Sequence, residues 1–203
     1  MTKNNFLLVA ILLIAFHNIS AQSYFGFRIE PVFYSVNIEK TVYNPTSTKD
    51  EKSFLTNVAV TFSFSTQIAE KLKLGFRPSL IMGPFLSEDL FDRLYNGIEG
   101  GFFANYSISD KQYLLLGVNS HIEFAGGGHT YSNDNVFLPY IVLGAGHFTS
   151  KNFTMELQFC YPLKKEVYGT YRDLGIGPSY ITTWNNYQVE WMIKFGLGFE
   201  WEL

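Results

Sequence analysis

Two short segments of the chain bring together a hydroxyl, an imidazole and an acid or amide, the groups that nucleophilic catalysis of acyl transfer uses. They are residues 129–133 (HTYSN) and the set Ser120, His121 and Glu123. Neighbouring residues of a β-strand point to opposite faces, so Ser120 and His121 would point apart. Three glycines just before residue 129 indicate a loop. We therefore predict that the chain is not an enzyme and has no catalytic residues.

Metal ligands and cofactor-binding groups are the next candidates. After the N-terminal segment discussed below, the histidines are His121, His129 and His147, isolated from one another and without the spacing of a metal site. Cys160 is the only cysteine, so no disulfide can form within the chain. We predict neither a metal nor a cofactor.

Charged residues on the polar faces of the expected strands form a third set. Its members are Arg28, Glu30, Lys73, Arg77, Glu99, Glu123, Glu156, Glu190 and Lys194, with His121 among them. Buried ions persist when they are paired, so we predict a network that neutralises itself inside a barrel. Arg77 and Glu99 lie on neighbouring strands, whereas Arg28 and Lys194 lie on the first and last strands, which meet on closure. An ion-selective pore is disfavoured, because eight strands enclose an interior only wide enough for side chains.

The elements that must position these residues are β-strands. Residues 189–203 alternate large apolar side chains with polar or small ones, the pattern of a strand with one apolar face. Residues 136–148 are strand-like too, but both faces are apolar and the sequence leaves their inward side open. Further strands with the same alternation are expected at residues 25–30, 58–65, 72–82, 98–106, 116–124 and 153–161. The count is eight strands.

The composition indicates which face of these strands points outward. Aromatic residues make up 18% of the chain and charged residues only 16%, where a soluble domain carries about 25% charged residues. Large rings fit lipid, whereas small and polar groups fit a narrow lumen. The seven strands with clear alternation place no charge on the apolar face, as expected for a surface in a bilayer. We predict an all-β fold: an eight-stranded antiparallel up-and-down transmembrane β-barrel.

Connections between the expected strands alternate in length. Short ones fall at 68–71, 109–111 and 149–152. Longer, more polar ones fall at 39–53, 84–93, 125–135 and 164–188. This alternation is typical of outer-membrane barrels, which have short periplasmic turns and longer outer loops. An even number of strands then places both termini at the short-turn end.

The first 21 residues have the pattern of a secretory signal peptide. Lys3 precedes an apolar run at 6–16, and Ile19-Ser20-Ala21 is a small-residue cleavage site. The run is too short to cross a membrane as a helix, which needs about 20 residues. We therefore expect residues 1–21 to be removed and 22–203 to form one barrel domain.

Residues 22–203 resemble the small eight-stranded outer-membrane barrels of Gram-negative bacteria, the family that includes the OmpA and OmpX type. Members of that family usually end in a strand that the barrel-assembly machinery reads, with a polar residue, a glycine and two aromatics in fixed spacing. Lys194, Gly196, Phe199 and Trp201 match that signal, although this chain adds two residues after the last aromatic. The resemblance implies an outer-membrane location, contact with outer-membrane lipids and lipopolysaccharide, and the assembly machinery as a partner during biogenesis.

The expected loops carry the remaining candidates for specific contacts. The loop at 164–188 is rich in tyrosine and glycine, a composition suited to contact surfaces, and Tyr168 and Tyr171 are the candidate contact residues. A formal charge of −3 without a basic cluster argues against nucleic acid as a partner. We predict a structural or surface-interaction protein with a polar, plugged lumen, long extracellular loops and an extracellular partner still to be found. The alternatives are a lipid A-modifying barrel enzyme and a soluble secreted barrel that binds an apolar ligand.

Overall fold

A computed structural model describes residues 22–43, 46–83, 96–123, 137–164, 169–174 and 182–203. The regular elements in these ranges are all β-strands. They are β1 (Ser23–Tyr43), β2 (Ser47–Ala69), β3 (Leu72–Met82), β4 (Gly97–Ser107), β5 (Gln112–Glu123), β6 (Phe137–Phe148), β7 (Phe153–Pro162), β8 (Gly169–Leu174) and β9 (Thr182–Glu202). The predicted signal peptide, 1–21, lies outside the described residues.

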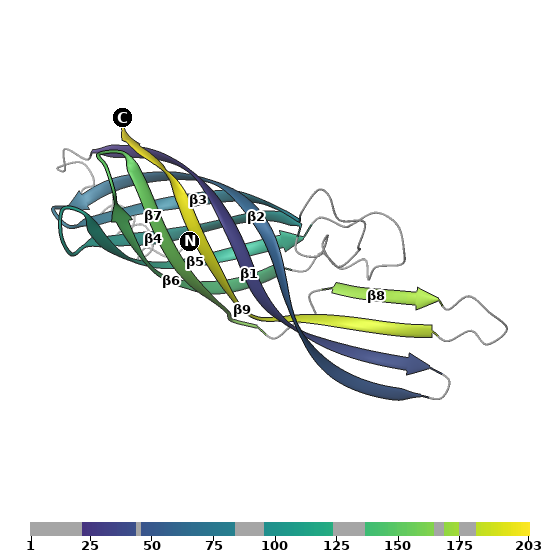
Figure 1. Ribbon diagram of the computed structural model, residues 1–203. Helices are drawn as coiled ribbons and strands as arrows, with labels where there is room; N and C mark the ends of the chain where they lie inside the picture. The colour runs from purple at the N-terminus through teal and green to yellow at the C-terminus, as the bar shows by residue number, and fades with distance from the viewer. Residues whose placement is uncertain (1–21, 44–45, 84–95, 124–136, 165–168, 175–181) are drawn as a thin grey trace, which may run out of the picture.

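The strands form a closed antiparallel meander. Each strand from β1 to β6 pairs with the strand that follows it, β7 pairs with β9, and β9 pairs with β1 to close the sheet. Eight strands therefore make the wall, and the predicted up-and-down barrel is confirmed (Figure 1). Tyr24 pairs with Glu202, so β1 starts and β9 ends at the same end of the barrel. We call this the turn end, because the short turns after β2, β4 and β6 lie there.

At the opposite end, part of the sheet continues beyond the barrel (Figure 1). Residues 36–43 of β1, 47–55 of β2 and 182–190 of β9 extend past the strands beside them, and β8 pairs with β9 there. We call these residues, with β8, the projecting sheet. The prediction of irregular loops at 39–53 and 164–188 is therefore wrong in part. Much of these two ranges is paired as β-strand, although the residues are polar and show no alternation with apolar ones. The predicted loops at 84–93 and 125–135 lie outside the described residues.

Successive side chains along the strands point alternately to the outer face of the barrel and into its lumen. Phe102 on β4 is 74% exposed, whereas Glu99 on the same strand is 4% exposed. Along most of the wall, large apolar side chains point outward, and nearly all charged and small polar ones point into the lumen. The inward side of β6, which the sequence left open, includes Leu138, Tyr140 and Val142.

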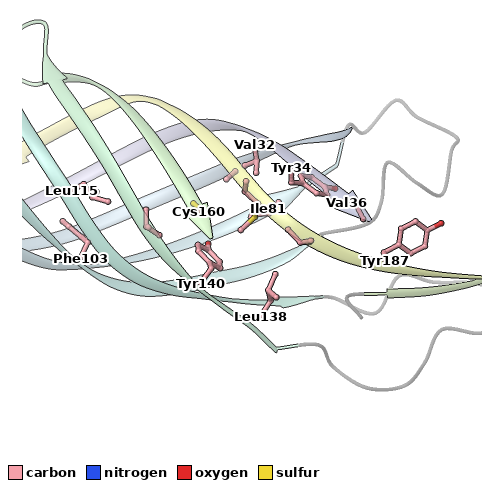
Figure 2. Packing of buried hydrophobic residues seen from close by; sticks show 14 residues of the cluster. Val32, Tyr34, Val36, Ile81, Phe103, Leu115, Leu138, Tyr140, Cys160 and Tyr187 are labelled. Carbon is pink, nitrogen blue, oxygen red and sulfur yellow. The ribbon is translucent and has the colours of Figure 1, made fainter. Parts of the chain in front are cut away.

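The lumen contains apolar residues as well as ions. The side chains that fill it toward the projecting sheet are Val32, Tyr34, Ala59, Ile81, Leu138, Tyr140, Cys160 and Met192, each no more than 1% exposed (Figure 2). We call these eight residues the upper cluster. Sequence alternation predicted a polar, plugged lumen lined by small and polar groups with scattered charges. The upper cluster departs from this, which also explains why β6 has two apolar faces.

Inward glycines keep the lumen wide enough for its side chains. A Cβ on Gly101 would overlap the carbonyl oxygen of Val118, whereas one on the outward Gly100 would lie 3.3 Å from the Phe76 ring. We expect Gly101→Ala to reduce the unfolding free energy by about 1–3 kcal/mol, the cost of overpacking, and Gly100→Ala to cost less. Denaturant titration in detergent or lipid checks this, and equal effects at the two positions would contradict it.

Candidate functional site

The exterior of the barrel is an apolar surface without counterpart in soluble proteins. Outward side chains exposed by 37% or more include phenylalanine, leucine, isoleucine and valine residues from every wall strand. At the turn end, Trp201 stacks with Phe199 at 5.7 Å and with Phe25 at 6.1 Å between ring centroids. Monomeric soluble proteins rarely expose apolar patches above a few hundred Å², and a closed sheet leaves no wall strand with an unpaired backbone edge in lipid. The chain is a transmembrane β-barrel.

Closed antiparallel barrels of even strand number, with an aromatic belt, are the β-architecture of bacterial outer membranes. The bilayer around this barrel is accordingly an outer membrane. Among the described residues, no helix is long and apolar enough to span a membrane. A soluble barrel with an apolar ligand inside is excluded, because the apolar face points outward and the lumen holds the charges.

No protein-family profile matches the chain, and no curated protein matches it as a relative. Among solved structures, it is similar to the N-terminal β-barrel domain of Pseudomonas aeruginosa OprF, with 12% identity, 87% of this chain and 97% of that chain covered, and a TM-score of 0.42. The outer membrane protein OprG from Pseudomonas aeruginosa shows 14% identity, 88% and 96% coverage, and a TM-score of 0.46. Neisserial surface protein A shows 9% identity, 83% and 95% coverage, and a TM-score of 0.31. The fold assignment itself rests on the strand pairing.

Glu156 on β7 is the centre of the larger ionic cluster in the lumen. Arg77 on β3 reaches across the barrel and donates two hydrogen bonds to it, at 2.6 and 3.0 Å. Tyr113 donates a third, at 2.6 Å. The guanidinium of Arg28 lies 3.8 Å away, so two cations face this one carboxylate. One buried acid therefore ties together strands from opposite sides of the wall.

Neutral donors bind the second carboxylate of this cluster, Glu30. Thr61 donates to Glu30 at 2.7 Å and also lies 2.8 Å from the hydroxyl of Ser79. The amide of Gln158 donates to Glu30 at 3.1 Å and to Glu156 at 2.8 Å. The two carboxylates thus belong to one hydrogen-bonded network.

A second ionic group lies nearer the projecting sheet. Lys194 on β9 donates to Glu99 on β4 and, at 3.2 Å, to the hydroxyl of Tyr140. Asn119 also donates to Tyr140, at 2.8 Å. The imidazole of His121 lies 3.7 Å from Glu99. This group closes the lumen just below the upper cluster.

A third ion pair lies at the turn end. Lys73 lies 2.6 Å from Glu200, and its ammonium stands 3.4 Å above the ring centre of Tyr24. These three residues also line a vestibule of about 950 Å³ that is formed with the short turns. The described lumen therefore carries four basic side chains (Arg28, Lys73, Arg77 and Lys194) and four acidic ones (Glu30, Glu99, Glu156 and Glu200).

The ion pairs that form in the lumen differ from those expected from the order of the strands. Arg77 binds Glu156 and not Glu99, because Arg77 stands opposite Gly101 in the sheet and its long side chain crosses the lumen. Glu99 instead binds Lys194. Arg28 and Lys194, on the adjacent first and last strands, serve different clusters. The sequence reasoning missed Tyr113, Gln158, Tyr140 and Glu200 as network members. Glu200 could have been found, because it lies an even number of residues after Lys194 on the same strand and therefore shares its inward face.

The contacts described for Glu190 lie outside the lumen network. The β1–β9 register shifts between Ser35 and Val36, a bulge that turns Glu190 away from the inward alternation. It accepts hydrogen bonds from Lys52 at 2.9 Å and Ser35 at 3.2 Å on the outer side. For Glu123 only the backbone is described, which pairs with Gly97.

The proposed C-terminal signal residues have identifiable places in the barrel. Lys194 points inward to Glu99, and a Cβ on Gly196 would lie 3.2 Å from a carboxylate oxygen of Glu30. Phe199 and Trp201 point outward in the aromatic belt. Their reading by the assembly machinery remains a prediction.

The candidates for catalysis and surface contact are placed as follows. Ser120 and His121 stand next to each other in β5, with His121 fully buried, while residues 129–133 lie outside the described part. No group of three or more His, Cys, Asp or Glu able to hold a metal occurs in the described ranges. Tyr171 belongs to β8 and its backbone pairs with Asn185, while Tyr168 lies outside the described residues.

Proposed function

We propose that this protein is an outer-membrane anchor that presents its projecting sheet outside the cell for contact with other surfaces. The observation that carries this proposal is strand length. Strands β1, β2 and β9 have 21, 23 and 21 residues, whereas about 9–11 residues cross a bilayer. At about 3.3 Å per residue, the excess extends roughly 30 Å beyond the membrane.

Packing at the base of the projecting sheet supports its rigid attachment to the barrel. Val36, Tyr187 and Val189 are each no more than 3% exposed, and they join the apolar residues of the lumen in one cluster, with Ile38 and Leu55 packed against it. Because the core continues from the barrel into the sheet, the membrane anchor fixes the direction in which the sheet points. Rigid presentation of this kind suits a contact surface, since little ordering is needed on binding.

The lumen supports an anchor and not a pore. The four cations and four carboxylates of its described part are paired or clustered across the barrel, and the upper cluster fills the end toward the projecting sheet. The alternative of a lipid A-modifying enzyme has no support in the described residues, where Ser120 and His121 point to opposite sides of the wall.

Shortening the β1–β2 hairpin tests the proposal. Ile38 pairs with Glu51, so a two-residue Asn-Gly turn between them in place of residues 39–50 keeps the register. We expect the variant to enter the outer membrane and keep its heat-modifiable gel migration, while binding of whole cells to host matrix or to other cells falls to background. Retained binding by a correctly inserted variant would place the contact surface elsewhere.

A further inference from the structure

Several polar atoms deep in the turn-end half of the lumen lack a protein partner. All three side-chain nitrogens of Arg28 lack a hydrogen-bond partner, as do Nε of Arg77 and Oδ1 of Asn105. These side chains are 1%, 7% and 5% exposed. The nearest carboxylate oxygen of Glu156 lies 3.8 Å from Arg28, beyond hydrogen-bond distance.

Buried polar groups are bonded to protein or to ordered water in nearly all structures. An unsatisfied buried donor costs about 1–3 kcal/mol, and more when it is charged. Water is a small donor and acceptor that can satisfy these atoms, and small residues flank Arg28 on the neighbouring strands. Gly26 and Ser63 are neighbours on β1 and β2, and the stem of Arg28 lies against Gly198 of β9.

The source of this water is the vestibule at the turn end. Tyr24, Lys73 and Glu200 line both the vestibule and the floor of the lumen. Glu200 in that floor keeps 7% exposure, and Ser65 above it keeps 6%. The exposed fraction then falls along the inner face of β2, to 3% at Ser63 and zero at Ala59.

Among the described residues, the other end of the lumen offers no comparable route. The upper cluster supplies almost no polar atoms that could hold water, and Cys160, Ile81 and Met192 are all 0% exposed. Water needs two to four polar partners to occupy a cavity. The Lys194–Glu99 pair lies directly below this cluster and is closed by Tyr140 and Asn119.

We propose that the turn-end half of the lumen is a water-binding shaft, open only to the periplasmic side, in which Arg28 holds the innermost waters. The shaft ends below the upper cluster, so water reaches the ionic centre of the barrel without crossing the membrane. This inference rests on the proposed function in one respect, because it requires a lumen that is closed toward the cell exterior.

Cysteine accessibility along one strand tests the shaft. In a Cys160→Ala background, single cysteines replace Ser65, Ser63 and Ala59 on the inner face of β2, and the native protein reports on Cys160 itself. Ag⁺, a thiol probe about the size of water, is applied to the purified barrel in nanodiscs, and thiols left free are counted with a maleimide after denaturation. We expect Ser65→Cys and Ser63→Cys to react at least about tenfold faster than Ala59→Cys and Cys160, whose reaction requires an opening of the core.

Heat-modifiable gel migration first confirms that each variant is folded. Because Ser63 and Ser65 both lie within the shaft, the experiment still decides if one of these two variants fails to fold. Slow reaction at every position would mean a dry lumen and would overturn the shaft while leaving the closed anchor intact. Fast reaction at all positions would reveal an open channel and overturn both proposals. Faster reaction at Ala59→Cys than at Ser65→Cys would reverse the direction of access and also reject the shaft.

Discussion

Replacing Glu156 with glutamine is expected to lower the unfolding free energy of the barrel by roughly 3–5 kcal/mol, the usual cost of removing one partner from a buried ionic cluster. The carboxylate accepts two hydrogen bonds from Arg77 and one from Tyr113, and it faces Arg28. Without it, two buried guanidinium groups share the lumen with Glu30 as the nearest counter-charge in their cluster. Denaturant titration in lipid vesicles, followed by tryptophan fluorescence, measures the change.

Glu202→Gln is the matched control, because Glu202 lies at the exposed end of β9 and has no buried partner to lose. We expect its unfolding free energy to remain within about 0.5 kcal/mol of the native value. A Glu156→Gln barrel as stable as the control would show that the cluster does not hold the wall together. Arg77→Met provides a second measurement of the same cluster from the opposite strand.

Replacing Val118 with arginine is expected to cost roughly 2–4 kcal/mol, the penalty for arginine at the lipid-facing midplane of a β-barrel. Val118 is 56% exposed on the outer face of β5, between Phe102 on β4 and Ile141 on β6. The same substitution on a water-exposed surface is nearly neutral. The size of the effect therefore reports directly on which face of the sheet meets lipid.

Leu114→Arg on the same strand is the depth control. Leu114 is 50% exposed and lies four residues closer to the turn end, where arginine reaches the interface and costs about 0–1 kcal/mol. Val118→Leu tests tolerance to a change of side chain alone. If both arginine variants are as stable as the native barrel, the outer face does not lie in a bilayer.

The wall of the barrel could be predicted because its pattern is local. Residues 58–65 and 153–161 alternate apolar and small or polar side chains, and the alternation alone assigns each to lipid or lumen. The inward positions of Arg28, Glu99, Glu156 and Lys194 follow from the same rule. The alternation rule failed at β6, where Leu138 and Tyr140 point inward and are apolar because they belong to the upper cluster.

Departures from local alternation could not be foreseen in the same way. The outer side of the projecting sheet has no lipid to face, and only its base carries buried apolar residues, so the polar residues beyond that base do not show the alternation that identifies the other strands. Glu190 has the parity of an inward residue, and only the bulge in the β1–β9 pairing turns it toward Lys52. A bulge depends on how two distant strands fit together, which one strand read alone does not reveal.

The sequence by itself determined the class of fold, the number of wall strands, and which residues of most strands face lipid, because side chains of a strand alternate with a fixed period. Only the tertiary structure decided which charges meet. Arg77 reaches Glu156 across the lumen, and Lys194 reaches Glu99, because barrel closure and stagger bring together strands far apart in sequence. The same closure places the guanidinium of Arg28 where no protein group accepts its hydrogen bonds, and it continues the core from the upper cluster into the projecting sheet.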